Sequence, residues 1–193
     1  MTRRSPSVTR AGLLRRGSYV AGVALVGVPA LVAAAQSPKQ DVRVLNLLLL
    51  VEYTESAFYS QALQGDALTG ELRSFAEQVL EHEKAHLSLL TSVLGDAAAD
   101  EPGYDFGDAT SDRKAFTDAA ARLEDLAVAA YNGQAGNVTP EAFAAAARIV
   151  SVEARHAAWI RSIVGIDPAP QTTDEPRTEA QVRAGLEELG VQL

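Results

Sequence analysis

The second half of the chain repeats the residue spacing of the first half, and this repeat limits the fold more than any other feature. Glu52 precedes Tyr59 by seven residues, and Glu124 precedes Tyr131 by the same interval. The segments EKAHLSLLTSVLG and EARHAAWIRSIVG each place a histidine three residues, and a glycine twelve residues, after their first glutamate. The two halves are offset by 72 and 70 residues, as expected for a duplicated helical hairpin. We expect the chain to fold with a pseudo-two-fold axis that runs down the packed helices.

Four long stretches with the hydrophobic period of a helix follow residue 36. Each is roughly 24–26 residues, or about 36–39 Å, long. Thr139, Pro140 and Glu141 form a helix start signal, and Gly95 and Gly165 stand where helices would end. The sequence therefore predicts an all-α fold, a four-helix bundle, with helices over about 41–64, 69–94, 111–134 and 139–164.

The composition supports this fold and excludes several kinds of site. With 193 residues the chain is long enough for one domain with a sizeable core but too short for two ordinary ones. Apolar residues make up 47% and aromatic residues 6%, and alanine dominates the apolar stretches, which favours packed helices over a sheet. The net charge of −8 argues against binding to nucleic acid. Because the chain has no cysteine, any metal must be bound by oxygen and imidazole.

The first 35 residues have the pattern of a secretory signal. A basic stretch ends at Arg15-Arg16, an apolar run of about 17 residues follows, and three alanines precede Gln36. The arginine pair resembles a twin-arginine signal, although the residues after it depart from that pattern, so the general secretory route stays open. An uncleaved anchor is the alternative, but the run is short and contains Pro29. We expect residues 1–35 to be a cleaved signal peptide and the protein to be exported, to the periplasm, the cell envelope or the medium.

The repeated residues predict a metal site. Residues three apart on a helix point the same way, so each Glu-x-x-His presents a carboxylate and an imidazole to one side. Two such pairs, with one glutamate from each remaining helix, form the ligand set of di-iron and di-manganese carboxylate bundles. Apolar neighbours indicate that these acids are buried, where a carboxylate without a cation or partner is unfavourable. The predicted ligands of two iron or two manganese ions are Glu52, Glu83, His86, Glu124, Glu153 and His156.

Other residues near this pattern receive different predictions. Glu55 competes with Glu52 as the ligand from the first helix, but the repeat pairs Glu55 with an alanine, which favours Glu52. His82 is expected at the surface because consecutive residues differ by about 100° around a helix. Tyr59 and Tyr131 are expected to be core residues, and either hydroxyl could orient a metal ligand.

Five segments carry a further signal: LVEYTESAFYSQAL, EHEKAH, the connector PGYDFG, AFTDAAARLEDLAVAAYNGQA and VEARHAAWIRSIVG. They resemble the ferritin-like domain family, which includes secreted bacterial proteins and plant desiccation-related proteins, over most of residues 36–166. The resemblance implies a left-handed bundle with two iron or manganese ions and chemistry on dioxygen or peroxide. It also implies that Glu83 and Glu153 bridge the metals, that Glu52 and Glu124 are terminal ligands, and that each histidine binds one metal.

The sequence leaves the reaction and the assembly open. One hypothesis is an oxidoreductase site that oxidises Fe(II) or consumes peroxide outside the cytoplasm. A second is a stress-protective or desiccation-protective bundle whose metal is structural or absent, and a third is a metal carrier or storage protein. Haem between subunits is not expected, because Met1 is the only methionine. Residues 167–193 are expected to form a linker and a short helix; nothing in them indicates a cage, and a homo-oligomer stays open. Membrane contact is expected only through an uncleaved signal segment.

Overall fold

The computed structural model describes residues 37–193 of the chain. The predicted signal peptide, residues 1–35, lies outside the described residues. Within 37–193, no helix is long and apolar enough to cross a membrane. The site residues predicted from the sequence all lie in the described part.

Four long helices dominate the described residues and confirm the all-α prediction. Three of the four begin at a side-chain cap, because Ser37, Asp112 and Thr139 each accept a hydrogen bond from a backbone amide of the following turn. Gly95 (φ +54°) and Gly165 (φ +77°) follow two of the helix ends in a left-handed conformation that favours glycine. The helices are α2 (Pro38–Ala62), α3 (Glu71–Leu94), α4 (Arg113–Gln134) and α5 (Pro140–Ile163).

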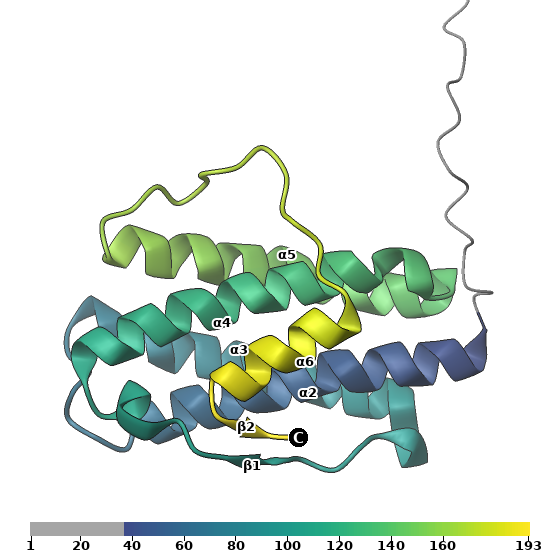
Figure 1. Ribbon diagram of the computed structural model, residues 1–193, viewed down its shortest axis with the longest axis horizontal. Coiled ribbons are helices and arrows are strands. Elements are labelled where there is room, and N and C mark those ends of the chain that lie inside the picture. Colours follow the sequence, from purple (N-terminus) through teal and green to yellow (C-terminus); the bar gives the residue numbers. More distant parts are fainter. Residues whose placement is uncertain (1–36) are drawn as a thin grey trace, which may run out of the picture. The chain divides into compact units, whose positions relative to one another are not determined.

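The helices form two hairpins, α2 with α3 and α4 with α5, which pack on each other through α2 with α4 and α3 with α5 (Figure 1). The connector between the hairpins runs back along the bundle, from the end of α3 to the start of α4. It contains the 3₁₀ helices η1 (Gly95–Ala97) and η2 (Gly107–Thr110), with strand β1 (Gly103–Tyr104) between them. A connector of this length allows α4 to start at the end of the bundle where α2 finishes.

The helices that the repeat makes equivalent, α2 with α4 and α3 with α5, run antiparallel to each other. Phe58, near the end of α2, stacks on Phe116, near the start of α4, with ring centroids 5.1 Å apart. At the other end of the bundle, Asp41 in the first turn of α2 accepts a hydrogen bond of 2.8 Å from the amide of Thr139, which follows α4. The pseudo-two-fold axis therefore crosses the bundle, and the prediction that it runs down the bundle is wrong. The repeat shows that two hairpins are equivalent, but the connector decides which way the second one points.

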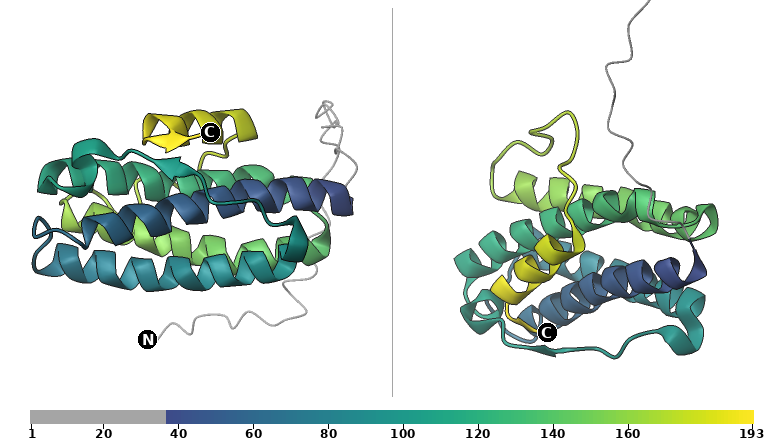
Figure 2. Two further views of the ribbon diagram at one scale, coloured as in Figure 1. Left: turned by 90° about the horizontal axis from the view of Figure 1, so that it is seen from below. Right: turned by 45° about the vertical axis from the view of Figure 1, so that its right-hand side comes forward.

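The C-terminal segment packs across the outside of the bundle (Figure 2). Helix α6 (Glu179–Glu188) begins at a capping box formed by Thr178 and Gln181 and packs on α4. Strand β2 (Val191–Gln192) then pairs antiparallel with β1 of the connector. Before α6 the backbone passes close to α4, since a Cβ at Gly133 would lie 1.9 Å from the Arg177 carbonyl oxygen. Glycine at this position permits the approach.

The core between the four helices is apolar except for one cluster. Leucine, alanine and aromatic side chains fill most of it, including the fully buried Phe58, Phe75 and Phe116. Nine polar or charged residues of the described chain are also buried, and seven of them are glutamate or histidine. All seven come from α2, α3, α4 and α5. The bundle therefore holds a concentrated set of ionisable groups inside an apolar shell.

Candidate metal centre

The structure brings all six predicted ligands together. Each of the four helices contributes, with one glutamate from α2 and one from α4, and a Glu-x-x-His pair from α3 and one from α5. The four glutamates are fully buried, and the two histidines are 8% and 2% exposed. The one-turn spacing of each pair places its carboxylate and imidazole on the inward face of the helix. The six residues are Glu52, Glu83, His86, Glu124, Glu153 and His156.

The ligand atoms fall into two groups that share one residue. In the first group, four residues each offer an atom within 4.8 Å of the others: Glu52, Glu83, His86 and Glu153. The second group has the same property and consists of Glu124, Glu153 and His156. Each group could hold a metal ion, and the Glu153 carboxylate belongs to both.

Both imidazoles direct Nδ1 toward the carboxylates. His86 Nδ1 lies 2.9 Å from Glu83, 2.9 Å from Glu153 and 3.1 Å from Glu52. His156 Nδ1 lies within ion-pair distance of three carboxylates, at 3.2 Å, 3.3 Å and 3.5 Å, although none of these contacts has hydrogen-bond geometry. The same ring nitrogen of each histidine is therefore in position to bind a cation.

Burial and pairing shift the pKa values of the cluster in opposing directions. Burial lowers the pKa of His86 and of His156, but the three glutamate carboxylates close to each Nδ1 outweigh this effect and raise the pKa to about 12. Burial raises the pKa of Glu83, whereas its close contacts with both imidazoles lower it to about 2. Burial raises the pKa of Glu124 to about 7 and that of Glu52 well above its usual range. Without a cation, the cluster therefore retains protons on both imidazoles.

The donor atoms of the cluster fit a metal ion. Both carboxylate oxygens of Glu153, one oxygen of Glu83, one of Glu124 and Nδ1 of His156 are buried without a hydrogen-bond partner among the described residues. Buried polar atoms are nearly always paired, so this many unpaired acceptors in one place requires an explanation. Carboxylate and imidazole are the ligands that iron and manganese take up in proteins. A bound cation would pair these atoms at once.

Two tyrosines connect the halves of the cluster. The Tyr59 hydroxyl, on α2, donates to Glu124 on α4. The Tyr131 hydroxyl, on α4, donates to Glu52 on α2. Both rings are buried. Glu52 and Glu124 thus each accept a hydrogen bond from a tyrosine of the other half of the repeat.

Two residues next to the cluster are more buried than their positions in the repeat indicate. His82 was expected at the surface, but it is partly buried and its Nδ1 lies 2.8 Å from Nε2 of His156. Glu55 is fully buried, and neither of its carboxylate oxygens has a hydrogen-bond partner among the described residues. A signal for both was present, because Glu55 is three residues after Glu52 and His82 is four residues before His86, which are same-face spacings on a helix.

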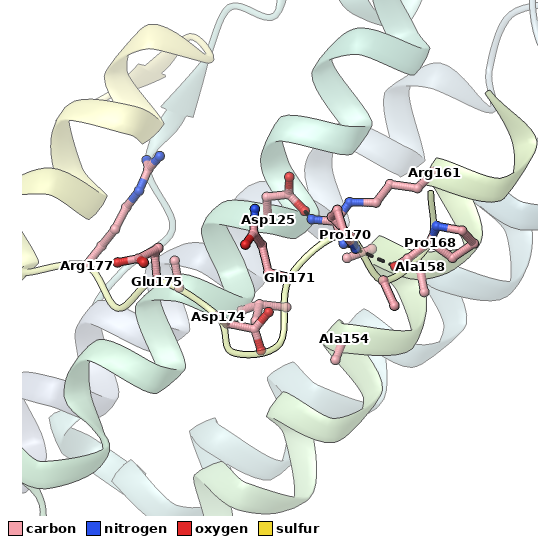
Figure 3. A pocket seen from close by; sticks show the side chains of 14 residues that line it. Asp125, Ala154, Ala158, Arg161, Pro168, Pro170, Gln171, Asp174, Glu175 and Arg177 are labelled. Atoms are coloured by element: carbon pink, nitrogen blue, oxygen red, sulfur yellow. Dashed lines mark hydrogen bonds and ion pairs between the residues drawn. The ribbon is translucent and has the colours of Figure 1, made fainter. Parts of the chain in front are cut away.

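A separate cavity lies outside the bundle core. It has a volume of about 370 Å³ and lies between α4, α5 and the segment that joins α5 to α6 (Figure 3). Asp125 and Arg161 form an ion pair of 2.5 Å at its wall, and Arg177 contributes from the joining segment. None of its lining residues belongs to the Glu and His cluster. The cavity is therefore distinct from the candidate metal centre.

Comparison with known proteins identifies the family. The family described as ferritin-like domain matches residues 40–166, which include nearly all of α2, the whole of α3 to α5, and all six clustered residues. No curated protein matches the chain. Since the match extends over more than half of the sequence and agrees with the observed bundle, the chain belongs to the ferritin-like domain family.

Proposed function

We propose that the cluster binds two iron or two manganese ions. The observation that carries the proposal is the pair of ligand groups that share Glu153, each with its atoms within 4.8 Å of one another. A carboxylate that belongs to two groups suits a bridge between two cations. The family resemblance supports the same role for Glu153 and Glu83.

Charge balance also favours two divalent ions. The four glutamates of the proposed ligand set carry four negative charges when ionised, which equals the charge of two divalent cations. The neutral imidazoles of His86 and His156 would complete the set. With no cation, the same buried carboxylates would need protons or histidinium partners, and burial of unpaired charge is strongly unfavourable.

We propose that the bound metals serve a redox function, the oxidation of Fe(II) or the consumption of peroxide. Iron or manganese in such a site supplies electron transfer to or from dioxygen or peroxide. The chain supplies fixed ligands, since the Tyr59 hydroxyl holds Glu124 and the Tyr131 hydroxyl holds Glu52. The surrounding leucine, alanine and aromatic side chains exclude water from the cluster.

We further propose that the chain acts outside the cytoplasm. The support is the basic stretch through Arg16, the apolar run after it and the alanines before Gln36. The protein recovered from its host outside the cytoplasm is expected to begin near Gln36 when its N-terminus is sequenced. An intact N-terminus on a protein that remains in the cytoplasm would contradict this part of the proposal.

Removal of either of the two glutamates that the family resemblance implies as bridges tests the metal assignment. Glu83→Ala and Glu153→Ala are each expected to reduce the bound metal from two ions per chain to less than one, because each variant removes a ligand from the centre of the cluster. Metal content is measured by mass spectrometry after Fe(II) is added without oxygen. Glu81→Ala is the matched control, since Glu81 is an exposed glutamate on the same helix as Glu83. Unchanged metal content in both cluster variants would refute the assignment.

The same preparation tests the redox proposal. The wild-type chain with two bound ions is expected to consume dioxygen or peroxide as Fe(II) is oxidised. Two bound ions without any turnover would contradict the redox function and favour a structural or carrier role. Absence of bound metal in the wild-type chain would contradict the whole proposal.

A further inference from the structure

His82 makes a direct contact with one of the two clustered histidines. Its Nδ1 lies 2.8 Å from Nε2 of His156, and the two ring planes differ by only 13°. Rings that overlap face to face stay about 3.5 Å apart, so a contact of 2.8 Å between nitrogens requires the rings to meet edge to edge in nearly one plane. This is the geometry of a well-aligned hydrogen bond between the imidazoles.

The hydrogen bond uses the nitrogen of His156 that faces away from the carboxylates. Nδ1 of His156 points at the buried glutamates, and Nε2 points at His82. A neutral imidazole carries its proton on one nitrogen and a lone pair on the other. If the proton of His156 resides on Nε2 and is donated to His82, the lone pair resides on Nδ1, where a cation would bind.

A third residue continues the chain of contacts to the protein surface. Nε2 of His82 lies 2.9 Å from the side-chain nitrogen Nε2 of Gln78, an exposed residue one turn earlier on α3. A carboxamide can present either its oxygen or its NH₂ group to a partner. With the carboxamide turned over, so that its oxygen takes the place of Nε2, Gln78 accepts from Nε2 of His82, and Nδ1 of His82 is free to accept from His156. The three side chains can thus support the tautomer of His156 that binds metal.

The other half of the cluster has no equivalent of this contact. The repeat pairs His82 on α3 with Val152 on α5, and valine cannot accept a hydrogen bond. Among residues 37–193, no hydrogen-bond partner of Nε2 of His86 is found. The two histidines are therefore equivalent in their contacts with carboxylates but not in their outer contacts.

We propose that His82 is a positioning residue that orients His156 and makes the cation position at His156 bind more tightly than the position at His86. The proposal rests on the proposed function, because it requires two bound cations. Outer partners of metal-binding histidines fix the ring and its tautomer, and their loss weakens metal binding about 10- to 100-fold. The two positions of this chain consequently differ in affinity although their ligands are related by the repeat.

Titration of the full chain with Co²⁺ tests this proposal. Visible absorption reports the coordination of cobalt, and competition with a chelator of known affinity gives the two dissociation constants. The wild-type chain is expected to bind two equivalents in two resolved steps. In His82→Ala the tighter step weakens about 10- to 100-fold and the weaker step is unchanged. His82→Asn is expected to recover most of the loss, because the asparagine oxygen can accept the hydrogen bond in place of Nδ1.

Combining His82→Ala with a substitution of either clustered histidine shows which cation position loses affinity. His82→Ala should weaken the remaining site in a His86→Ala background and have no effect in a His156→Ala background. Val152→Ala, at the position that the repeat pairs with His82, is the matched control and should leave both steps unchanged. Equal affinities in His82→Ala and the wild-type chain, or an equal loss in both backgrounds, would overturn the proposal. A wild-type chain that binds no Co²⁺ would instead overturn the proposed function.

Discussion

Addition of Mn²⁺ to the metal-free chain is expected to raise its melting temperature by about 10–20 °C. A ligand at about one hundred times its Kd stabilises the folded state by about 2.7 kcal/mol per site, and two sites contribute about twice that amount. For a chain of this size, each kcal/mol raises the melting temperature by about 2–4 °C. The cation would pair the buried carboxylate oxygens of Glu83, Glu124 and Glu153 that have no partner among the described residues without it. Thermal unfolding followed by circular dichroism measures the shift.

The size of this shift should increase with pH. The folded-state pKa of His86 and of His156 is raised to about 12, against about 6.5 in an unfolded chain. The stability that these groups contribute is fully present below about pH 6.5 and decreases as the pH rises toward 12, because the folded state retains protons that the unfolded state has lost. A cation must displace those protons, so binding strengthens as the pH rises. The metal-free chain should therefore melt lower at pH 8 than at pH 6, and the shift on adding Mn²⁺ should be larger at pH 8.

Glu81→Ala serves as the control for both measurements, since it removes an exposed carboxylate from α3. Its shift with Mn²⁺ should equal that of the wild-type chain. A shift that decreases from pH 6 to pH 8, or that is absent at both, would contradict displacement of protons from the cluster.

Replacement of Glu55 by methionine is expected to stabilise the metal-free chain by about 1–3 kcal/mol, which corresponds to a rise in melting temperature of about 2–12 °C. Glu55 is fully buried, and neither carboxylate oxygen has a hydrogen-bond partner among the described residues. Burial raises its pKa well above the usual range, with a further increase from the neighbouring carboxylates. Methionine has a similar length and no polar atom that requires a partner.

Glu52→Met is the matched control, because it changes a second buried glutamate on the same helix. Glu52 accepts hydrogen bonds from Tyr131 and His86, so its removal leaves the Tyr131 hydroxyl without this acceptor and takes away one of the three carboxylates close to His86. This variant should not stabilise the chain and should lose bound metal, whereas Glu55→Met should retain two ions. Loss of an ion in Glu55→Met would show that Glu55 is a ligand and that the repeat is an incomplete guide to the site.

The sequence predicted the helices and the six clustered residues because both depend on spacing. The helical period, the stop signal at Gly95 and the start signal at Thr139 are local features. The observed bounds of the four helices accordingly lie within a few residues of the predicted ones. The repeat then identified the six clustered residues although the packing of the helices was not yet known. The match to the ferritin-like domain over residues 40–166 confirms the family that the motifs suggested.

The remaining features depend on contacts between helices. The direction of the second hairpin is set by the connector, whose course no local pattern specifies. His82 was placed at the surface from its angle on α3 alone, but the His156 ring on α5 reaches it across the gap between the helices. The repeat pairs Glu55 with an alanine and so does not predict a buried carboxylate there, but burial follows from the face of α2 on which Glu55 lies.

The exchange of tyrosines between the halves bears on how such a protein could arise. Tyr59 of the first hairpin contacts a glutamate of the second, and Tyr131 of the second contacts a glutamate of the first. An ancestral chain with one hairpin would therefore have assembled the complete cluster only as a homodimer, with both metal positions identical. Once the two copies were joined in one polypeptide, each could mutate alone. Glu55 and His82, which the repeat pairs with Ala127 and Val152, are two of the positions at which the copies differ.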